Sequence, residues 1–258
     1  MPEGDTIAWH ANRIRPVLEG LVPDEIRTPH PRHAMDRWPE RLGDRRVTRV
    51  DTHGKHLFLR FEGGLALHSH LGMKGSWAVY APGRRWRRSS TRAWLIIKAR
   101  DHEVVQFDGP TLELITDGRS RFDQRLAALG PDVLAPEFDG PSFLRRLRGD
   151  DQSRPIGDAL LDQRNLAGIG NIWKSEGCWE VQLDPWQPTG TVPDDRLLAL
   201  VEAIRPRMLD SAEHGPRVIE PRVYGRTTMP CQRCGGRIRS AGQGDDNRTT
   251  YWCPGCQR

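Results

Sequence analysis

Cys231-Gln232-Arg233-Cys234 and, after an eighteen-residue spacer, Cys253-Pro254-Gly255-Cys256 decide the fold of the end of this chain. A Cys-x2-Cys pair presents two thiolates from one tight turn, and two pairs supply the four ligands of a tetrahedral ion. The spacer is long enough for a β-hairpin that brings the pairs together. We therefore predict one structural Zn²⁺ in a zinc finger over 226–258, bound by Cys231, Cys234, Cys253 and Cys256. Four thiolates leave no open coordination position, so a catalytic zinc is the disfavoured alternative.

The composition of the whole chain is that of a globular protein, and its excess positive charge is compatible with a nucleic-acid partner without proving one. Of 258 residues, 36% are hydrophobic and 28% charged, and the formal charge is +5 with a pI of about 9.2. Only four of the 39 cationic residues are lysines, and guanidinium groups form bidentate pairs with phosphate. No apolar run reaches 18 residues and no signal peptide opens the chain, so we expect a soluble, cytoplasmic protein without a membrane partner. The fifth cysteine, Cys178, has no partner motif and is interpreted as a small buried residue.

The periodicity of the sequence divides the chain into a β-rich part and a helical part. A first helix is expected from Asp5 or Thr6 to Gly20, with Ile7, Ala11, Ile14 and Leu18 on its buried face. Short alternating or apolar segments between turn residues then predict seven strands, which favour a sandwich or barrel. These strands are Val47–Asp51, His56–Phe61, Leu65–His70, Ser76–Tyr80, Ala93–Ala99, Glu103–Phe107 and Leu112–Thr116.

The character changes near Asp117, where helical periodicity replaces alternation. The expected helices are Phe122–Leu129, Pro141–Arg148, Ile156–Leu161, Ile172–Val181 and Asp194–Asp210. The fold class is therefore α+β, with an N-terminal β domain, a sandwich or a barrel, and its leading helix over 1–117, a helical domain over 118–225 and the four-cysteine finger over 226–258.

The beginning of the chain, Met1-Pro2-Glu3-Gly4, carries a possible nucleophile. Removal of Met1 would leave the secondary amine of Pro2 beside the carboxylate of Glu3. An α-amino group has a pKa of about 7.7–8.0, so a useful fraction of it is neutral and nucleophilic near neutral pH. A secondary amine that attacks a sugar C1′ forms an iminium ion directly. The alternative is a proline that only starts the chain.

A second motif is the glycine-rich turn Asn165-Leu166-Ala167-Gly168-Ile169-Gly170-Asn171, which separates two expected helices. Glycines allow successive N–H groups to point into one concavity, and such a nest beside a helix N-terminus binds phosphate. Asn171 can cap the following helix or donate to the phosphate, and Lys174 lies one turn further on. An ordinary helix–helix turn with an asparagine cap remains the alternative.

Together, these motifs resemble the formamidopyrimidine-DNA glycosylase / endonuclease VIII family of base-excision repair enzymes, on the endonuclease VIII side and in an actinobacterial-like form. Any one match is weak, but the segments follow the family's order along nearly the whole chain. They are Met1-Pro2-Glu3-Gly4, Gly54-Lys55-His56-Leu57, His68-Ser69-His70-Leu71-Gly72-Met73, Leu160-Leu161-Asp162-Gln163, Gly168-Ile169-Gly170-Asn171-Ile172, Val223-Tyr224-Gly225-Arg226 and Arg248-Thr249-Thr250-Tyr251-Trp252-Cys253.

The resemblance implies a β-sandwich joined to a helical domain with a helix-two-turns-helix and a zinc finger, acting on damaged double-stranded DNA. It implies a bifunctional DNA glycosylase and AP lyase that removes oxidised bases through a proline Schiff base, with β- and δ-elimination and no redox cofactor. A monomer suits a cleft that closes on a duplex. Catalytic roles are implied for Pro2 as nucleophile, for Glu3 in proton transfer and for Lys55, which also contacts phosphate. DNA-binding roles are implied for His70, Met73, Asn171, Lys174, Tyr224 and Arg248.

Within this set, Asn171 and Arg248 match residues that grip the phosphate beside the lesion, and Met73 matches a residue that fills the void left by the flipped base. A grip is needed because extrusion of a nucleotide costs a few kcal/mol. His70 on its own is equally a strand histidine, and Met73 on its own would be assigned to the core.

Three departures from the family pattern affect these expectations. The family usually has a second glutamate two residues after Gly4, where Thr6 stands here; Asp5 can replace that carboxylate or can cap the helix. The Arg-x-Phe wedge of the purine-specific branch is missing from Phe107–Leu112, which favours oxidised pyrimidines, whereas Gly72-Met73 resembles the purine branch. The basic segment Gly83–Arg88 has no role to transfer, and contacts DNA or is a solvated loop.

Two other functions stay open from the sequence. One is a glycosylase for oxidised purines such as formamidopyrimidines or 8-oxoguanine. The other is a non-catalytic protein that binds damaged DNA, which explains the charge and the finger but not Pro2-Glu3.

Overall fold

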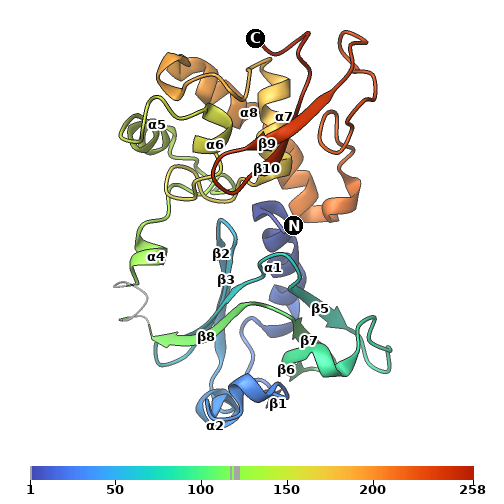
Figure 1. The fold of residues 1–258 in the computed structure, drawn as a ribbon. Helices are drawn as coiled ribbons and strands as arrows, with labels where there is room; N and C mark the ends of the chain where they lie inside the picture. Colours follow the sequence, from blue (N-terminus) through green and yellow to red (C-terminus); the bar gives the residue numbers. More distant parts are fainter. Residues whose placement is uncertain (1, 117, 119–122) are drawn as a thin grey trace. The chain divides into compact units, whose positions relative to one another are not determined.

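Two four-stranded antiparallel sheets form the N-terminal part of the chain, which spans blue to green in Figure 1. Their strand orders are β1-β6-β7-β5 and β2-β3-β4-β8. Residues from both sheets enter one hydrophobic cluster, so the predicted β-sandwich is confirmed. The strands are β1 (Glu25–Arg27), β2 (Val47–His53), β3 (His56–Phe61), β4 (Leu65–His70), β5 (Ser76–Tyr80), β6 (Ala93–Ala99), β7 (His102–Phe107) and β8 (Thr111–Thr116).

The seven predicted strands are all present, because each alternates or runs apolar between residues that turn the chain. Gly63 and Gly64 have positive φ between β3 and β4, and Arg100 and Asp101 have positive φ between β6 and β7. These turns align Phe61 with Leu65 and Ala99 with His102. The sequence did not predict β1 or the short helix α2 (Trp38–Leu42), since three and five residues are too few to show a period.

The first helix, α1 (Gly4–Leu18), packs its apolar face into the sandwich core. The four residues expected on that face are all at most 1% exposed: Ile7, Ala11, Ile14 and Leu18. Pro16 lies inside the last turn, where its missing N–H removes one hydrogen bond of the helix.

The remaining helices have a separate hydrophobic core. They are α5 (Gly140–Arg148), α6 (Ile156–Ala159), α7 (Asn171–Glu180) and α8 (Asp194–His214), preceded by α4 (Gln124–Ala127). α7 and α8 approach closely at Gly177, where a Cβ would lie 2.9 Å from Leu200 Cδ2. Their bounds agree with the predictions to within two residues, except that α8 runs four residues beyond Asp210 before Gly215 ends it with a φ of 101°.

This computed structural model describes residues 2–116, 118 and 123–258, so the predicted positions Asp117 and Phe122 lie outside the described residues. Contacts group Pro2 and the described part of Thr6–Ala127 into one unit, and Glu3–Asp5 and Ala128–Arg258 into another. The predicted domain limits at 117 and 225 stay predictions. Within the second unit, β9 (Arg239–Gln243) and β10 (Arg248–Trp252) form the antiparallel hairpin shown in red in Figure 1. No helix in the described residues is both long and apolar enough to cross a membrane.

Candidate functional site

The N-terminus of α7 holds the carboxylate of Glu3. Glu3 Oε2 accepts hydrogen bonds from the backbone N–H groups of Gly170 (2.9 Å) and Trp173 (3.3 Å), and Oε1 accepts from Ile172 (2.8 Å). These N–H groups have no partner within the helix, and the helix dipole favours a negative charge at this end. The N–H groups at the glycine-rich turn therefore bind the carboxylate of the protein's own Glu3, which is 1% exposed, and the binding of phosphate there stays a prediction.

The glycines of the turn are required for this contact. A Cβ on Gly170 would lie 2.4 Å from Glu3 Cδ, so no other residue leaves space for the carboxylate. Gly168 has a φ of 101° and its carbonyl accepts a 2.8 Å hydrogen bond from Gly4 N. A Cβ on Gly4 would in turn lie 2.9 Å from Gly168 Cα. The glycines that predicted phosphate binding are thus also the residues that allow two backbone segments to approach closely.

Asp5 is tied to the same unit through α8. Its carboxylate accepts a 2.5 Å hydrogen bond from Ser211 Oγ, and the side chain is 4% exposed. The structure thus gives Asp5 an anchoring contact, which neither of the two roles considered from the sequence included.

Asn171 and Arg248 are brought together by the finger hairpin. Asn171 Nδ2 donates a 2.6 Å hydrogen bond to the carbonyl of Thr249, the residue next to Arg248. Arg248 is partly exposed and donates to Asp246 Oδ2 at 3.0 Å. Surface pairs of this kind contribute little to stability, so a phosphate can compete with Asp246 for the guanidinium.

The structure corrects the expectation that Lys174 binds DNA, because this side chain is fully buried and presents no surface to a ligand. Its ammonium donates to Thr250 Oγ1, and Gln243 Oε1 lies at 3.5 Å. Burial lowers the pKa of Lys174 to about 8, although Cys178, Asp158 and Glu3 raise it. The physical reason for the correction is that the finger hairpin covers this turn of α7. Lys174 therefore fastens the finger to the helix and does not contact DNA directly in this conformation.

Tyr224 belongs to a segment whose backbone is held by hydrogen bonds to a buried glutamate. Glu176 on α7 is 0% exposed, and its Oε1 accepts N–H bonds from Val223 (2.9 Å) and Tyr224 (3.0 Å). Arg207 lies 3.0 Å from Glu176 Oε2 and balances the charge. Burial, Tyr251 and Glu3 raise the pKa of Tyr224, so its hydroxyl stays protonated at neutral pH. Sequence reasoning missed Glu176, because nothing in the pattern of α7 distinguishes it from a solvent-facing glutamate.

Within the sandwich unit, Lys55 and His70 lie close enough to interact electrostatically. Lys55 is in the turn between β2 and β3, and His56, the first residue of β3, pairs in register with His70 of β4. Burial, followed by the positive charge of Lys55, lowers the pKa of His70, so its ring is neutral at physiological pH. Met73 is 79% exposed, so the interpretation of this residue as core is wrong.

A chain of hydrogen bonds across three strands fixes His56, the residue after Lys55. Glu113 Oε1 accepts from His68 Nδ1 at 2.9 Å, and His68 Nε2 lies 2.8 Å from His56 Nδ1. Because a carboxylate only accepts, the bond to Glu113 makes His68 Nε2 an acceptor and His56 Nδ1 a donor. Burial lowers the pKa of His56 to about 3, which keeps the ring neutral. The alternation of these histidines was readable in the sequence, but their pairing needed the register of the sheet.

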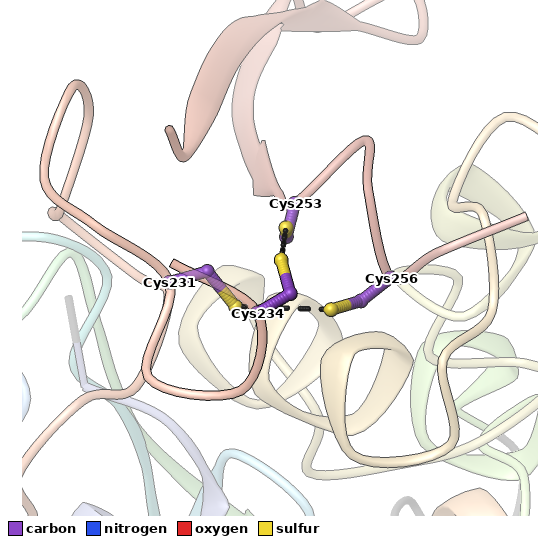
Figure 2. Close-up of side chains that lie close together, drawn as sticks. All are labelled: Cys231, Cys234, Cys253 and Cys256. Atoms are coloured by element: carbon purple, nitrogen blue, oxygen red, sulfur yellow. Dashed lines mark hydrogen bonds between the residues drawn. The ribbon is translucent and has the colours of Figure 1, made fainter. Parts of the chain in front are cut away.

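The four cysteines of the finger converge on one point, as Figure 2 shows. Their Sγ atoms all lie within 4.8 Å of one another, with Cys231–Cys256 at 3.9 Å and Cys234–Cys253 at 3.5 Å. A tetrahedral ion with bonds of 2.3 Å to sulfur needs sulfurs about 3.8 Å apart. Trp179 Nε1 donates to Cys231 Sγ at 3.3 Å, which suits a thiolate. The cluster can therefore bind a metal ion.

Cys178 is fully buried in α7 and lies outside the cluster, which confirms its interpretation as a small buried residue.

Comparisons with known proteins match the chain from end to end. Residues 1–122 match the model of the formamidopyrimidine-DNA glycosylase N-terminal domain, and 129–220 match that of the formamidopyrimidine-DNA glycosylase H2TH domain. A "Probable endonuclease 8 2" of Streptomyces coelicolor is 43% identical, over 100% of this chain and 94% of that protein. The "DNA-(apurinic or apyrimidinic site) lyase Nei2" of Mycolicibacterium smegmatis is 34% identical, over 100% and 99%. The fold is that of Lactococcus lactis Fpg solved with a DNA containing N7-benzyl-Fapy-dG, with a TM-score of 0.83, 24% identity and full coverage of both chains.

Proposed function

Because this chain belongs to the formamidopyrimidine-DNA glycosylase / endonuclease VIII family, we propose that it is a bifunctional DNA glycosylase and abasic-site lyase of base-excision repair. The observation that carries the proposal is the start of the chain, where Pro2 is followed by a glutamate held by three backbone N–H groups. A protein that only binds DNA leaves the Pro2-Glu3 pair at this position unexplained. The substrate is damaged double-stranded DNA and the working form is a monomer.

The chemistry starts with the amine of Pro2, once Met1 is removed. Its lone pair attacks C1′ of the damaged nucleotide, the N-glycosidic bond breaks, and the base leaves with the bonding electrons and a proton. Ring opening of the sugar gives an iminium ion between Pro2 and C1′. Loss of a C2′ proton then expels the 3′ phosphate, a second elimination expels the 5′ phosphate, and hydrolysis frees the proline.

Glu3 assists in two ways that follow from its position. Its peptide bond to Pro2 keeps a negative charge next to the nitrogen that becomes cationic, which stabilises the iminium ion. Its carboxylate also moves protons during ring opening and elimination. The helix N-terminus holds the carboxylate in place, so little reorganisation is needed when charge develops.

The DNA backbone is held by residues of both units. In the sandwich, Lys55 and His70 contact phosphate, with His56 fixed beside Lys55 by His68 and Glu113. In the helical unit, Asn171, Tyr224 and Arg248 contact the phosphates beside the lesion. Met73, with its exposed and flexible thioether, fills the space of the extruded nucleotide.

We assign Zn²⁺ to the four cysteines, since four thiolates at tetrahedral spacing are the ligand set that zinc prefers in structural sites. When bound, the ion holds the hairpin that carries Arg248 and covers Lys174. The protein's own residues perform the catalytic steps.

Oxidised pyrimidines are the proposed lesions, with oxidised purines as the second candidate. The loop after β7 lacks the purine-branch wedge and packs on the turn that carries Met73: a Cβ on Gly72 would lie 2.7 Å from Pro110 Cγ. A short loop braced in this way presents no arginine or aromatic side chain to the opposite base.

The activity can be tested by borohydride trapping on four duplexes that contain thymine glycol, dihydrouracil, 8-oxoguanine or a ring-opened purine. We expect a covalent protein–DNA complex with each excised lesion and faster single-turnover excision of the two pyrimidines. Excision of purines alone would favour the second candidate. Tight binding of every duplex without any trapped complex, by protein shown by mass spectrometry to lack Met1, would leave a DNA-binding protein.

The phosphate grip predicts that Asn171→Ala and Arg248→Ala each weaken binding of an abasic-analogue duplex by roughly 10- to 100-fold, as expected for hydrogen bonds to a charged group. For Arg248→Ala, the slope of log Kd against log salt should fall by about 0.9, the value for one lost phosphate contact. The matched control is Arg145→Ala, an exposed arginine on α5, which should leave the affinity and the slope unchanged. Equal affinities of both variants and wild type, at one fixed salt concentration, would rule the grip out.

A further inference from the structure

The sandwich unit has a cavity of about 720 Å³ that the residues assigned above do not use. It lies where α1, β5 and the basic segment 84–88 meet. Its lining includes five arginines and no carboxylate among the described residues: Arg13, Arg84, Arg85, Arg87 and Arg88. A cavity of this size holds a small-molecule ligand or one nucleotide unit, and its charge selects an anion.

Three of these arginines are available to a ligand. Arg84, Arg85 and Arg87 are exposed, and their guanidinium groups make no hydrogen bond or ion pair with any residue in the described part of the chain. Arg88 differs, since it donates to Asp108 Oδ2 at 3.0 Å and to the carbonyl of Lys74 at 3.2 Å. The pair with Asp108 fixes one end of the segment.

The segment is anchored, which argues against a freely solvated loop. Trp86 Nε1 donates to Glu103 Oε2 at 2.8 Å, and its ring packs on Tyr80 and edge-on to Phe107. Arg87 N donates to the Tyr80 hydroxyl at 3.2 Å. These bonds use the side chain of Trp86 and the backbone of Arg87, so the arginine side chains are presented on a fixed support.

An aromatic surface stands beside these charges. Trp9 of α1 is partly exposed and lines the cavity, and Arg13, one turn later, has its guanidinium carbon 4.9 Å from the centre of the Trp9 ring. Combined stacking and guanidinium contacts are the means by which proteins hold single-stranded nucleic acid. Burial and then the charges of Arg13 and Arg88 keep the neighbouring His10 neutral, with a pKa of about 3.

We propose that this cavity is a second nucleotide-binding site, in which Arg84, Arg85 and Arg87 bind phosphate and Trp9 stacks with the base. The ligand class is a nucleotide phosphate, supplied by a DNA strand or by a free nucleotide. The site is separate in its residues from Pro2, Glu3 and Lys55, so it does not depend on the proposed catalytic chemistry.

The test measures binding of a fluorescein-labelled twelve-residue oligothymidylate to the full-length protein by anisotropy at several salt concentrations. For Arg84→Ala/Arg87→Ala we expect at least a tenfold loss of affinity and a salt slope smaller by about 1.4, since each phosphate contact on a single strand contributes about 0.7. Trp9→Ala should lose roughly 5- to 100-fold, and Trp9→Phe should recover most of that loss, because any aromatic ring can stack.

The control is Arg145→Ala/Arg217→Ala, which removes the same charge from exposed positions of the helical unit and should leave affinity and slope unchanged. Competition with deoxyadenosine monophosphate and with inorganic phosphate identifies the source. If the nucleotide competes at a lower concentration than inorganic phosphate, the site binds both the base and the phosphate. If only the unlabelled strand competes, the natural ligand is a DNA strand. Wild-type affinity and slope in the arginine variant would overturn the proposal, and equal binding by Trp9→Ala and wild type would overturn the stacking.

Borohydride trapping on abasic duplex separates this result from the proposed function. The cavity variants should trap at the wild-type single-turnover rate once the DNA is saturated. Unaltered melting curves for the exposed arginine variants establish that a loss of binding does not come from unfolding.

Discussion

Replacement of Pro2 by glycine is expected to abolish base excision and most borohydride trapping, with a loss in single-turnover rate on the order of 10³-fold or more. Glycine retains an amine, but the iminium ion that it forms has an N–H and can lose this proton to give a neutral imine, a weaker electron sink, whereas the proline iminium ion has no N–H and stays cationic. Glycine also lacks the ring that fixes the geometry of the nitrogen. The hydrogen bonds of Glu3 to α7 do not involve the side chain of residue 2, so binding of an abasic-analogue duplex should persist.

Two matched proteins control this experiment. Pro82→Gly makes the same substitution at an exposed turn of the same unit and should excise at the wild-type rate. Wild-type protein that retains Met1, as judged by mass spectrometry, has an intact proline without a free amine; it should bind DNA but not trap it. Undiminished excision by Pro2→Gly would remove Pro2 from the mechanism, and trapping by the Met1-retaining form would move the nucleophile elsewhere.

Replacement of Cys253 by alanine is expected to remove the metal and unfold the finger. Structural Zn²⁺ stabilises small domains by roughly 10–16 kcal/mol, and removal of one of the four thiolates breaks the closed tetrahedral ligand set. Metal analysis should fall from about one zinc per chain to near zero. Because Lys174 is covered by Thr250 and Gln243 of the hairpin, its ammonium should become accessible, and the grip of Arg248 on DNA should be lost.

Cys178→Ala is the internal control, since Cys178 is equally buried but lies in α7 outside the cluster. Its loss removes the packing of one sulfur atom and should leave zinc content and duplex affinity unchanged. A Cys253→Ala protein with full zinc content and wild-type affinity would contradict the assignment of this cluster as the structural metal site.

The sandwich strands and the metal cluster were predictable because their signals are local. Alternation between turn residues defines each strand, and the spacing of two Cys-x2-Cys pairs defines the cluster. Lys174 was mispredicted because its burial depends on Thr250 and Gln243, about seventy residues later in the chain, and no local pattern indicates this cover.

In the candidate site, too, contacts between residues far apart in the sequence could not be predicted. The glycine-rich turn indicated an anion site, but the sequence did not show that Glu3 fills it, because the contact joins residues 167 positions apart. Glu176 and the chain from Glu113 to His56 were missed for the same reason. The family resemblance implied roles for Pro2, Asn171 and Arg248. The structure added the hydrogen bonds of Glu3, Asn171 and Arg248 to the residues around them.

The assignment of Glu3–Asp5 to the helical unit also has a consequence for biosynthesis. A ribosome makes the chain from the N-terminus, at about 5–20 residues per second. The hydrogen bonds of Glu3 to Gly170, Ile172 and Trp173 cannot form until those residues have been made, and the bond of Asp5 waits for Ser211. During this interval of roughly ten to forty seconds, these anchoring contacts are not yet formed and cannot hinder the removal of Met1 on which the proposed role of Pro2 depends. The order of synthesis thus allows the amine to be exposed before the residues that anchor its neighbour exist.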